Sequence, residues 1–160
     1  SEALKSLKET LFGEMLSYNS KTNELNVQGE VEGEIVGGNL SIIYSLTGTK
    51  SQLDTNGKIL FIEDLDEYLY HIDRMMMNLD RAGLLANLKG LVVGGMTDMN
   101  DNTIPFGKTA KEIIVDTVKK YNYPVCFDFP AGHVDDNRTL IMGRNARLKV
   151  SKEEIQLNFS

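Results

Sequence analysis

Lys58-Ile59-Leu60-Phe61-Ile62 is a compact apolar run without polar alternation, and it ends at Glu63-Asp64. A run of this kind is typical of a central strand that is buried on both faces of a largely parallel sheet. Leu91-Val92-Val93, closed by Gly94-Gly95, repeats the pattern, and Pro124-Val125-Cys126-Phe127 begins a third such run. The three runs predict the buried strands of an α/β fold.

Helical patterns alternate with these strands. The clearest has Gly83 at its expected end and apolar residues at intervals of three and four, namely Leu65, Leu69, Ile72, Met76 and Leu79. Thr109 and Glu112 form a capping box that opens a second helix. Asn39 is a suitable N-cap for a short helix through Leu46. This alternation predicts a mostly parallel central sheet flanked by helices.

The two ends of the chain differ from its middle. Residues 1–14 carry leucines at helical spacing and are expected to form a helix that stops at Gly13. A strand is expected over 31–36, and short strands over 139–142, 145–150 and 154–159. We expect the C-terminal strands to be antiparallel.

The composition limits the class of protein. The 160 residues are 41% hydrophobic and 25% charged, which fits one globular domain or slightly more. With 23 acidic and 17 basic residues the net charge is −6, so nucleic acid and anionic membranes are poor partners. No apolar run approaches the roughly 18 residues of a membrane span. The single cysteine, Cys126, lies in an apolar run, which excludes a disulfide framework and favours a reducing, cytoplasmic compartment.

Two motifs imitate ligand sites and fail. Gly107-Lys108-Thr109 matches the end of a phosphate-binding loop, but position 102 is Asn102 where that loop needs glycine. Asp98, Asn100 and Asn102 imitate a calcium loop, but its last position is Thr109 and not glutamate. We therefore expect neither a phosphate-binding loop nor a calcium loop, and no cofactor is expected.

His133 and Glu63 are the candidate catalytic residues. His133 lies in a loop just after a buried strand, and open α/β sheets bind ligands beyond the carboxyl ends of their strands. A histidine there can act as a general base near neutral pH. Glu63 holds the equivalent position after another buried strand, where its carboxylate could orient the imidazole and stabilise the imidazolium. The other histidine, His71, is expected on a helix surface.

Structural roles for these residues stay open at the level of sequence. A loop histidine is often simply solvated. Asp64 and Glu67 could cap the helix that follows, because acids favour a helix N-terminus. That account leaves Glu63 without a task at the end of an apolar strand, but the spacing alone does not decide between the two interpretations.

Three blocks of sequence occur in order between about residues 29 and 150. They are Gly33-Glu34-Ile35-Val36-Gly37-Gly38-Asn39-Leu40-Ser41, then Ile59-Leu60-Phe61-Ile62-Glu63-Asp64 with Tyr70-His71-Ile72-Asp73-Arg74-Met75 and Ala82-Gly83, and then Pro130-Ala131-Gly132-His133 with Asn137, Thr139-Leu140 and Gly143. Together they resemble the LD-carboxypeptidases, also called muramoyltetrapeptide carboxypeptidases, whose relatives include microcin-C immunity peptidases. The blocks correspond to the glycine-rich entry to the family's C-terminal domain, its acid-bearing strand and its histidine loop.

The resemblance implies an activity and a site. The family's enzymes are serine peptidases with a Ser-Glu-His triad and no metal, and Glu63 and His133 match the acid and the base. They cut an L,D-peptide bond and release a terminal D-amino acid, typically D-alanine from murein tetrapeptide in cell-wall recycling. Their nucleophilic serine lies in a separate N-terminal domain, and none of the serines in this chain sits in a strand–turn–helix setting suited to a nucleophile.

The resemblance also implies a domain organisation. Residues 15–160 would be the C-terminal domain, of the swivelling β/β/α type, and residues 1–14 a linker or the tail of the N-terminal domain. The implied partners are the protein's own N-terminal domain, a murein peptide and a second copy in a homodimer. The chain by itself is expected to be inactive. The alternative is a non-catalytic domain that binds a peptide or a protein.

Overall fold

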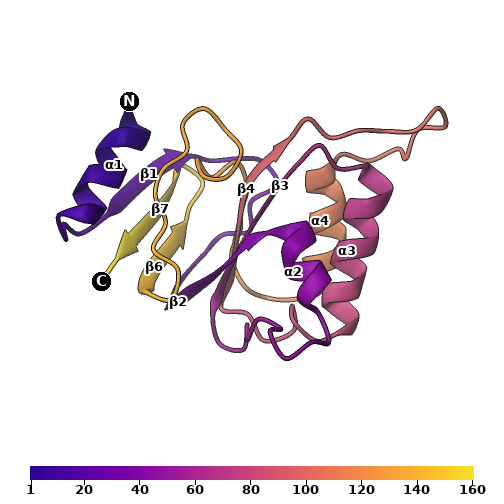
Figure 1. Cartoon of the computed structure of the whole chain (residues 1–160), viewed down its shortest axis with the longest axis horizontal. Helices are drawn as coiled ribbons and strands as arrows, with labels where there is room; N and C mark the ends of the chain where they lie inside the picture. Colours follow the sequence, from indigo (N-terminus) through magenta and orange to yellow (C-terminus); the bar gives the residue numbers. More distant parts are fainter.

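A mixed sheet of seven strands forms the centre of the molecule (Figure 1). The computed structural model describes residues 1–160, and the strands lie in the order β1-β7-β6-β2-β3-β4-β5. Four neighbouring strands are parallel: β2 (Gly29–Asn39), β3 (Ile59–Leu65), β4 (Gly90–Thr97) and β5 (Val125–Cys126). The first part of β2 also pairs antiparallel with β6, so this long strand joins the two halves of the sheet.

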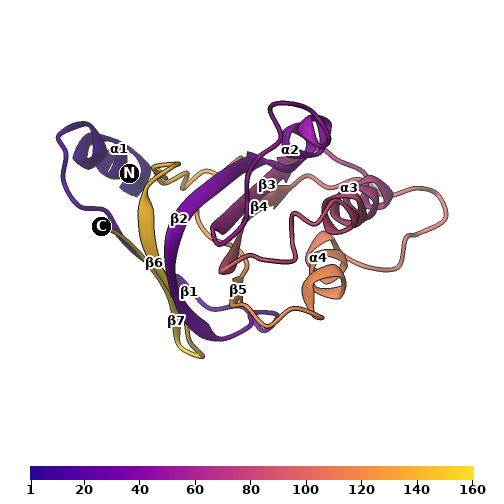
Figure 2. The same ribbon diagram turned by 90° about the horizontal axis from the view of Figure 1, so that it is seen from below.

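The antiparallel half consists of β1 (Ser17–Lys21), β6 (Asn145–Val150) and β7 (Glu154–Phe159). Helices α2 (Leu40–Leu46), α3 (Leu69–Arg81) and α4 (Ala110–Val118) lie together on one side of the parallel half, while α1 (Glu2–Leu11) lies beyond the antiparallel strands (Figure 2). The fold is therefore the predicted one, with a mostly parallel centre, flanking helices and antiparallel C-terminal strands. None of the helices combines the length and the apolar character that crossing a bilayer requires.

Strand β3 shows why uninterrupted apolar runs predict central strands. Leu60 and Ile62 point into a core of 20 buried residues shared with α2, α3 and α4. Ile59 and Phe61 point to the other face, into a core of 15 buried residues shared with β1, β6 and β7. Because side chains alternate between the faces of a strand, burial on both faces requires apolar residues at every position.

Local signals locate three of the helix ends correctly. The Asn39 side chain accepts a hydrogen bond from the Ile42 amide at the start of α2. Thr109 and Glu112 form the predicted capping box of α4. Gly83 follows the end of α3 with φ +79°, the left-handed conformation expected just past a helix.

Two predicted boundaries are wrong. Leu65 belongs to β3 and not to the helix, because β3 continues past Glu63-Asp64 and pairs Leu65 with Thr97 of β4. Residues 139–142 do not form a strand. The backbone amide of Thr139 donates instead to the hydroxyl of Ser6 in α1, at 3.0 Å, so this segment is tied to a helix and not to the sheet.

Candidate active site

The carboxyl ends of the parallel strands bring Glu63 and His133 into contact. Glu63 lies in the last part of β3 and is 6% exposed, while His133 lies in the loop after β5 with its side chain 51% exposed. Glu63 Oε2 lies 2.7 Å from His133 Nδ1 and accepts a second hydrogen bond from the His133 backbone amide, at 3.2 Å. The structure therefore joins the two predicted residues across 70 positions of sequence.

The hydrogen bond to Glu63 decides which ring nitrogen of His133 is available. An ionised carboxylate only accepts hydrogen bonds, so Nδ1 carries the proton and donates it. In the neutral ring Nε2 is then the unprotonated nitrogen, free to accept a proton from a reacting group. The hydrogen bond to Glu63 and the charge of this carboxylate raise the pKa of His133 above its ordinary value, with a smaller contribution from Asp64.

A local irregularity of the sheet accompanies Glu63. The register between β3 and β4 shifts between Ile62 and Asp64, which is the mark of a β-bulge. Bulges re-aim side chains and are common next to active sites. Sequence periodicity gave no sign of it, because the apolar run simply ends there.

Asp64 has a structural role that the sequence did not indicate. It is 2% exposed, and its carboxylate accepts hydrogen bonds from the Asn39 side chain, the Ser41 amide and its own neighbour's amide at Leu65, at 2.9–3.0 Å. It thereby ties the start of α2 to the end of β3. The interpretation in which Asp64 and Glu67 cap α3 is wrong, since that helix has no side-chain cap and Glu67 instead contacts His71 at 2.8 Å.

No nucleophile of this chain accompanies the pair. No serine hydroxyl forms a hydrogen bond to His133, and the hydroxyl of Ser41, in the first turn of α2, donates to Asn39 Oδ1. Complete burial raises the pKa of the Cys126 thiol to about 12, so that residue is not a reactive thiolate. The chain also contains no group of three or more potential ligands that could hold a metal ion.

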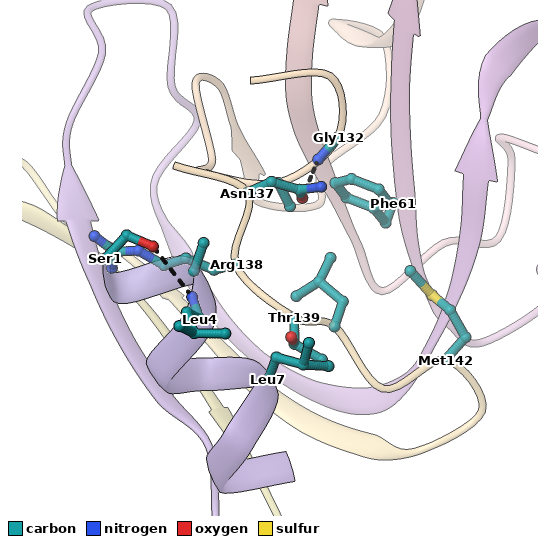
Figure 3. Close-up of a pocket in the computed structure, with 12 residues that line it drawn as sticks. Ser1, Leu4, Leu7, Phe61, Gly132, Asn137, Arg138, Thr139 and Met142 are labelled. Atoms are coloured by element: carbon teal, nitrogen blue, oxygen red, sulfur yellow. Dashed lines mark hydrogen bonds between the residues drawn. The ribbon is translucent and has the colours of Figure 1, made fainter. Parts of the chain in front are cut away.

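A pocket of about 640 Å³ lies between α1 and the histidine loop (Figure 3). Gly132 and Asn137 of the loop form part of its wall, joined by a hydrogen bond of 3.0 Å from the Gly132 amide to Asn137 Oδ1. Leu4 and Leu7 line it from α1. The pocket thus lies between the surroundings of His133 and α1, which is part of the predicted linker or tail.

Helix α1 presents its apolar residues outward. Leu4 is 67% and Leu11 76% exposed, while the only buried residue of the helix is Ser6. The leucine spacing predicts a helix, but no sequence signal shows that the face around Ser6, and not the leucines, contacts the domain.

Comparison with known proteins gives a consistent result. The family model described as LD-carboxypeptidase C-terminal domain matches residues 32–148. A probable murein peptide carboxypeptidase from Bacillus subtilis is 34% identical over 131 residues, which is 79% of this chain and 40% of that protein. The murein tetrapeptide carboxypeptidase of Pseudomonas aeruginosa is 28% identical over 120 residues, 74% of this chain and 38% of that protein.

Solved structures agree with these matches. The crystal structure of muramoyltetrapeptide carboxypeptidase from Oxalobacter formigenes matches with a TM-score of 0.89 and 30% identity, over 98% of this chain and 54% of that one. The microcin C7 self-immunity protein MccF matches with a TM-score of 0.70 and 22% identity, a likeness of fold alone. The chain spans only about 40% of the length of the curated relatives.

Proposed function

The chain belongs to the LD-carboxypeptidase family, and on this basis we propose that it is the C-terminal domain of a serine carboxypeptidase that cleaves an L,D-peptide bond. The substrate is murein tetrapeptide, from which the enzyme releases a terminal D-amino acid during cell-wall recycling in the cytoplasm. Glu63 is the acid and His133 the base of a Ser-Glu-His triad. The observation that carries the proposal is the 2.7 Å contact between Glu63 Oε2 and His133 Nδ1.

The geometry supports a definite division of roles. His133 Nε2 takes the proton of the serine hydroxyl as its oxygen attacks the peptide carbonyl, and later gives that proton to the leaving amine of the D-amino acid. Glu63 keeps Nδ1 protonated and stabilises the imidazolium formed in between. Water then hydrolyses the acyl-enzyme by the same route, with His133 again as base. No metal takes part in this scheme.

In this proposal the nucleophilic serine is supplied by an N-terminal domain and not by residues 1–160. Residues 15–160 form the C-terminal domain, and residues 1–14 belong to a linker or to the tail of an N-terminal domain that carries the serine and the oxyanion hole. Two observations support this partner: the relatives are more than twice as long as the matched segment, and the leucines of α1 are exposed beside the pocket that reaches Gly132. The complete enzyme is proposed to act as a homodimer.

The decisive experiment compares the two histidines in the longer protein that contains the serine domain. His133→Ala should reduce D-alanine release from murein tetrapeptide by several powers of ten. His71→Ala is the matched control, because His71 also contacts a glutamate through Nδ1, at 2.8 Å, but on the surface of α3. It should keep turnover within about twofold.

Retention of more than a tenth of wild-type turnover by His133→Ala would refute the assignment of the base. If the longer protein bound the peptide but never cleaved it, the alternative of a non-catalytic peptide- or protein-binding domain would replace the proposal. Binding is measured separately, by calorimetry with the tetrapeptide, so the two outcomes are distinct.

A further inference from the structure

Thr97 holds the carbonyl group of His133. Its hydroxyl donates to this oxygen at 2.6 Å, a short hydrogen bond for an O–H donor. Thr97 is the last residue of β4, and its own carbonyl accepts the amide of Asp66, which follows the end of β3. One residue of β4 therefore contacts both the exit of the acid-bearing strand and the histidine loop.

The contacts of Glu63 with His133 leave one freedom that Thr97 removes. The imidazole and the backbone amide of His133 both donate to the same atom, Glu63 Oε2. Because both hydrogen bonds end on the same oxygen, they fix the distance of His133 from Glu63 Oε2 but still allow His133 to rotate about that atom. The bond from Thr97 holds a third atom, the carbonyl oxygen, and so fixes the orientation of the backbone from which the ring projects.

The neighbourhood of Thr97 is shaped around this contact. A side chain at Gly95, two residues before Thr97 in β4, would place its Cβ 2.6 Å from Val134 and 3.0 Å from the Thr97 hydroxyl. The Gly95 amide also donates to the Ala131 carbonyl at 3.0 Å, so β4 holds the loop at two points that flank Gly132. A glycine at this position keeps the space that the threonine and the loop need.

We propose that Thr97 is a positioning residue, which fixes the backbone of His133 and thereby directs its imidazole toward the nucleophile. The proposal rests on the proposed role of His133 as base, but its geometric part concerns this chain alone. Thr97 touches no reacting atom in this scheme and acts only through His133.

The test begins with the 160-residue chain, without any activity assay. The imidazole of His133 is titrated by NMR in the wild type, in Thr97→Val and in Thr97→Ser, with His71 as internal reference. In the wild type Glu63 and Asp64 raise the pKa of His133. Thr97→Val should lower the pKa of His133 toward the ordinary histidine value. Without the bond from Thr97, the imidazole should be hydrogen-bonded to Glu63 for a smaller fraction of the time. Thr97→Ser retains the hydroxyl and should titrate like the wild type.

A matched control separates this effect from the general loss of a threonine hydroxyl. Thr117 donates to the Ile113 carbonyl at 3.0 Å within α4, away from the loop. Thr117→Val makes the same chemical change and should leave the titration of His133 as it is. Thr97→Ala, which removes the hydroxyl without a replacement methyl group, carries the same expectation as Thr97→Val and is titrated alongside it.

The longer protein supplies the kinetic arm. Misplacement of a catalytic group by about 1 Å can cost on the order of 100-fold in rate, so a partly loosened ring predicts a loss of about tenfold in kcat for Thr97→Val. KM should change less than twofold, and Thr97→Ser should restore kcat. Wild-type titration and wild-type kcat in Thr97→Val would overturn the proposal.

The outcomes separate this inference from the proposed function. If His133→Ala abolished turnover while Thr97→Val changed neither titration nor kcat, the positioning role would be wrong and the base assignment would stand. If Thr97→Val lowered the pKa of His133 but His133→Ala kept full turnover, the contact between Thr97 and His133 would be confirmed, whereas the role of His133 as base, and with it the positioning role of Thr97, would be wrong.

Discussion

Replacement of Gly132 by alanine tests the contact between the histidine loop and Glu63 most directly. Gly132 has φ +99°, a conformation that residues with a side chain rarely adopt. A Cβ built on it would lie 2.7 Å from the Cβ, the Cγ and the Oε2 of Glu63. Two of these atoms are close to the backbone of a buried strand residue, so they cannot simply swing away.

The expected loss of unfolding free energy in Gly132→Ala has two parts, and the same substitution at a second glycine measures one of them alone. Left-handed backbone costs a residue with a side chain about 1–2 kcal/mol. Overpacking of a well-packed site adds typically about 1–3 kcal/mol. Gly143 has φ +83° but nothing within 4 Å of its would-be Cβ. Gly143→Ala should therefore lower the unfolding free energy only by the backbone cost of about 1–2 kcal/mol. Gly132→Ala should lower it by the sum of the backbone and packing costs, about 2–5 kcal/mol.

Urea denaturation of the 160-residue chain measures both variants, and an NMR titration follows His133 in each. If the loop in Gly132→Ala relieves the clash by moving away from Glu63, the loss of stability shrinks and the pKa of His133 falls toward its ordinary value. Equal destabilisation by the two substitutions, together with an unchanged His133 titration in Gly132→Ala, would refute the packing that we describe.

Three further predictions concern Glu63 and His133. In the longer protein Glu63→Gln should reduce turnover by about 10³–10⁴-fold, because an amide cannot stabilise the imidazolium, whereas Glu67→Gln should stay within twofold; the reverse ranking would contradict our choice of acid. The 160-residue chain should unfold cooperatively on heating yet leave an L,D-tetrapeptide intact for hours at micromolar concentration, and D-alanine release that His133→Ala abolishes would reveal a nucleophile within it. Since folding raises the pKa of His133, its contact with Glu63 should stabilise the fold fully below about pH 6.5 and progressively less as the pH rises through the raised value; a difference in Tm between wild type and His133→Ala that is constant from pH 6 to 9 would disprove this.

Two capping signals, which depend only on neighbours along the chain, were reliable. The capping box at Thr109 and the N-cap at Asn39 each involve groups within three residues, and both are present as predicted. The periodicity signal failed at Leu65, which lies four residues before Leu69 and so continues the helical spacing by coincidence. What decides its state is pairing with Thr97 on another strand, and periodicity carries no information about such a partner.

The candidate active site, like the fold, was predicted from the sequence only in part. The sequence by itself determined that Glu63 closes one buried apolar run and that His133 follows another, because such runs are long enough to identify. It placed Glu63 just after its strand, whereas β3 includes Glu63 and continues to Leu65. Only the tertiary structure decided that the strands lie two places apart in one parallel sheet, that a bulge accompanies Glu63 and that Thr97 holds the histidine loop. The direction in which α1 presents its leucines was likewise decided by the fold. These features arise from contacts between residues far apart in the chain, and a single sequence encodes them only through the energy of the whole fold.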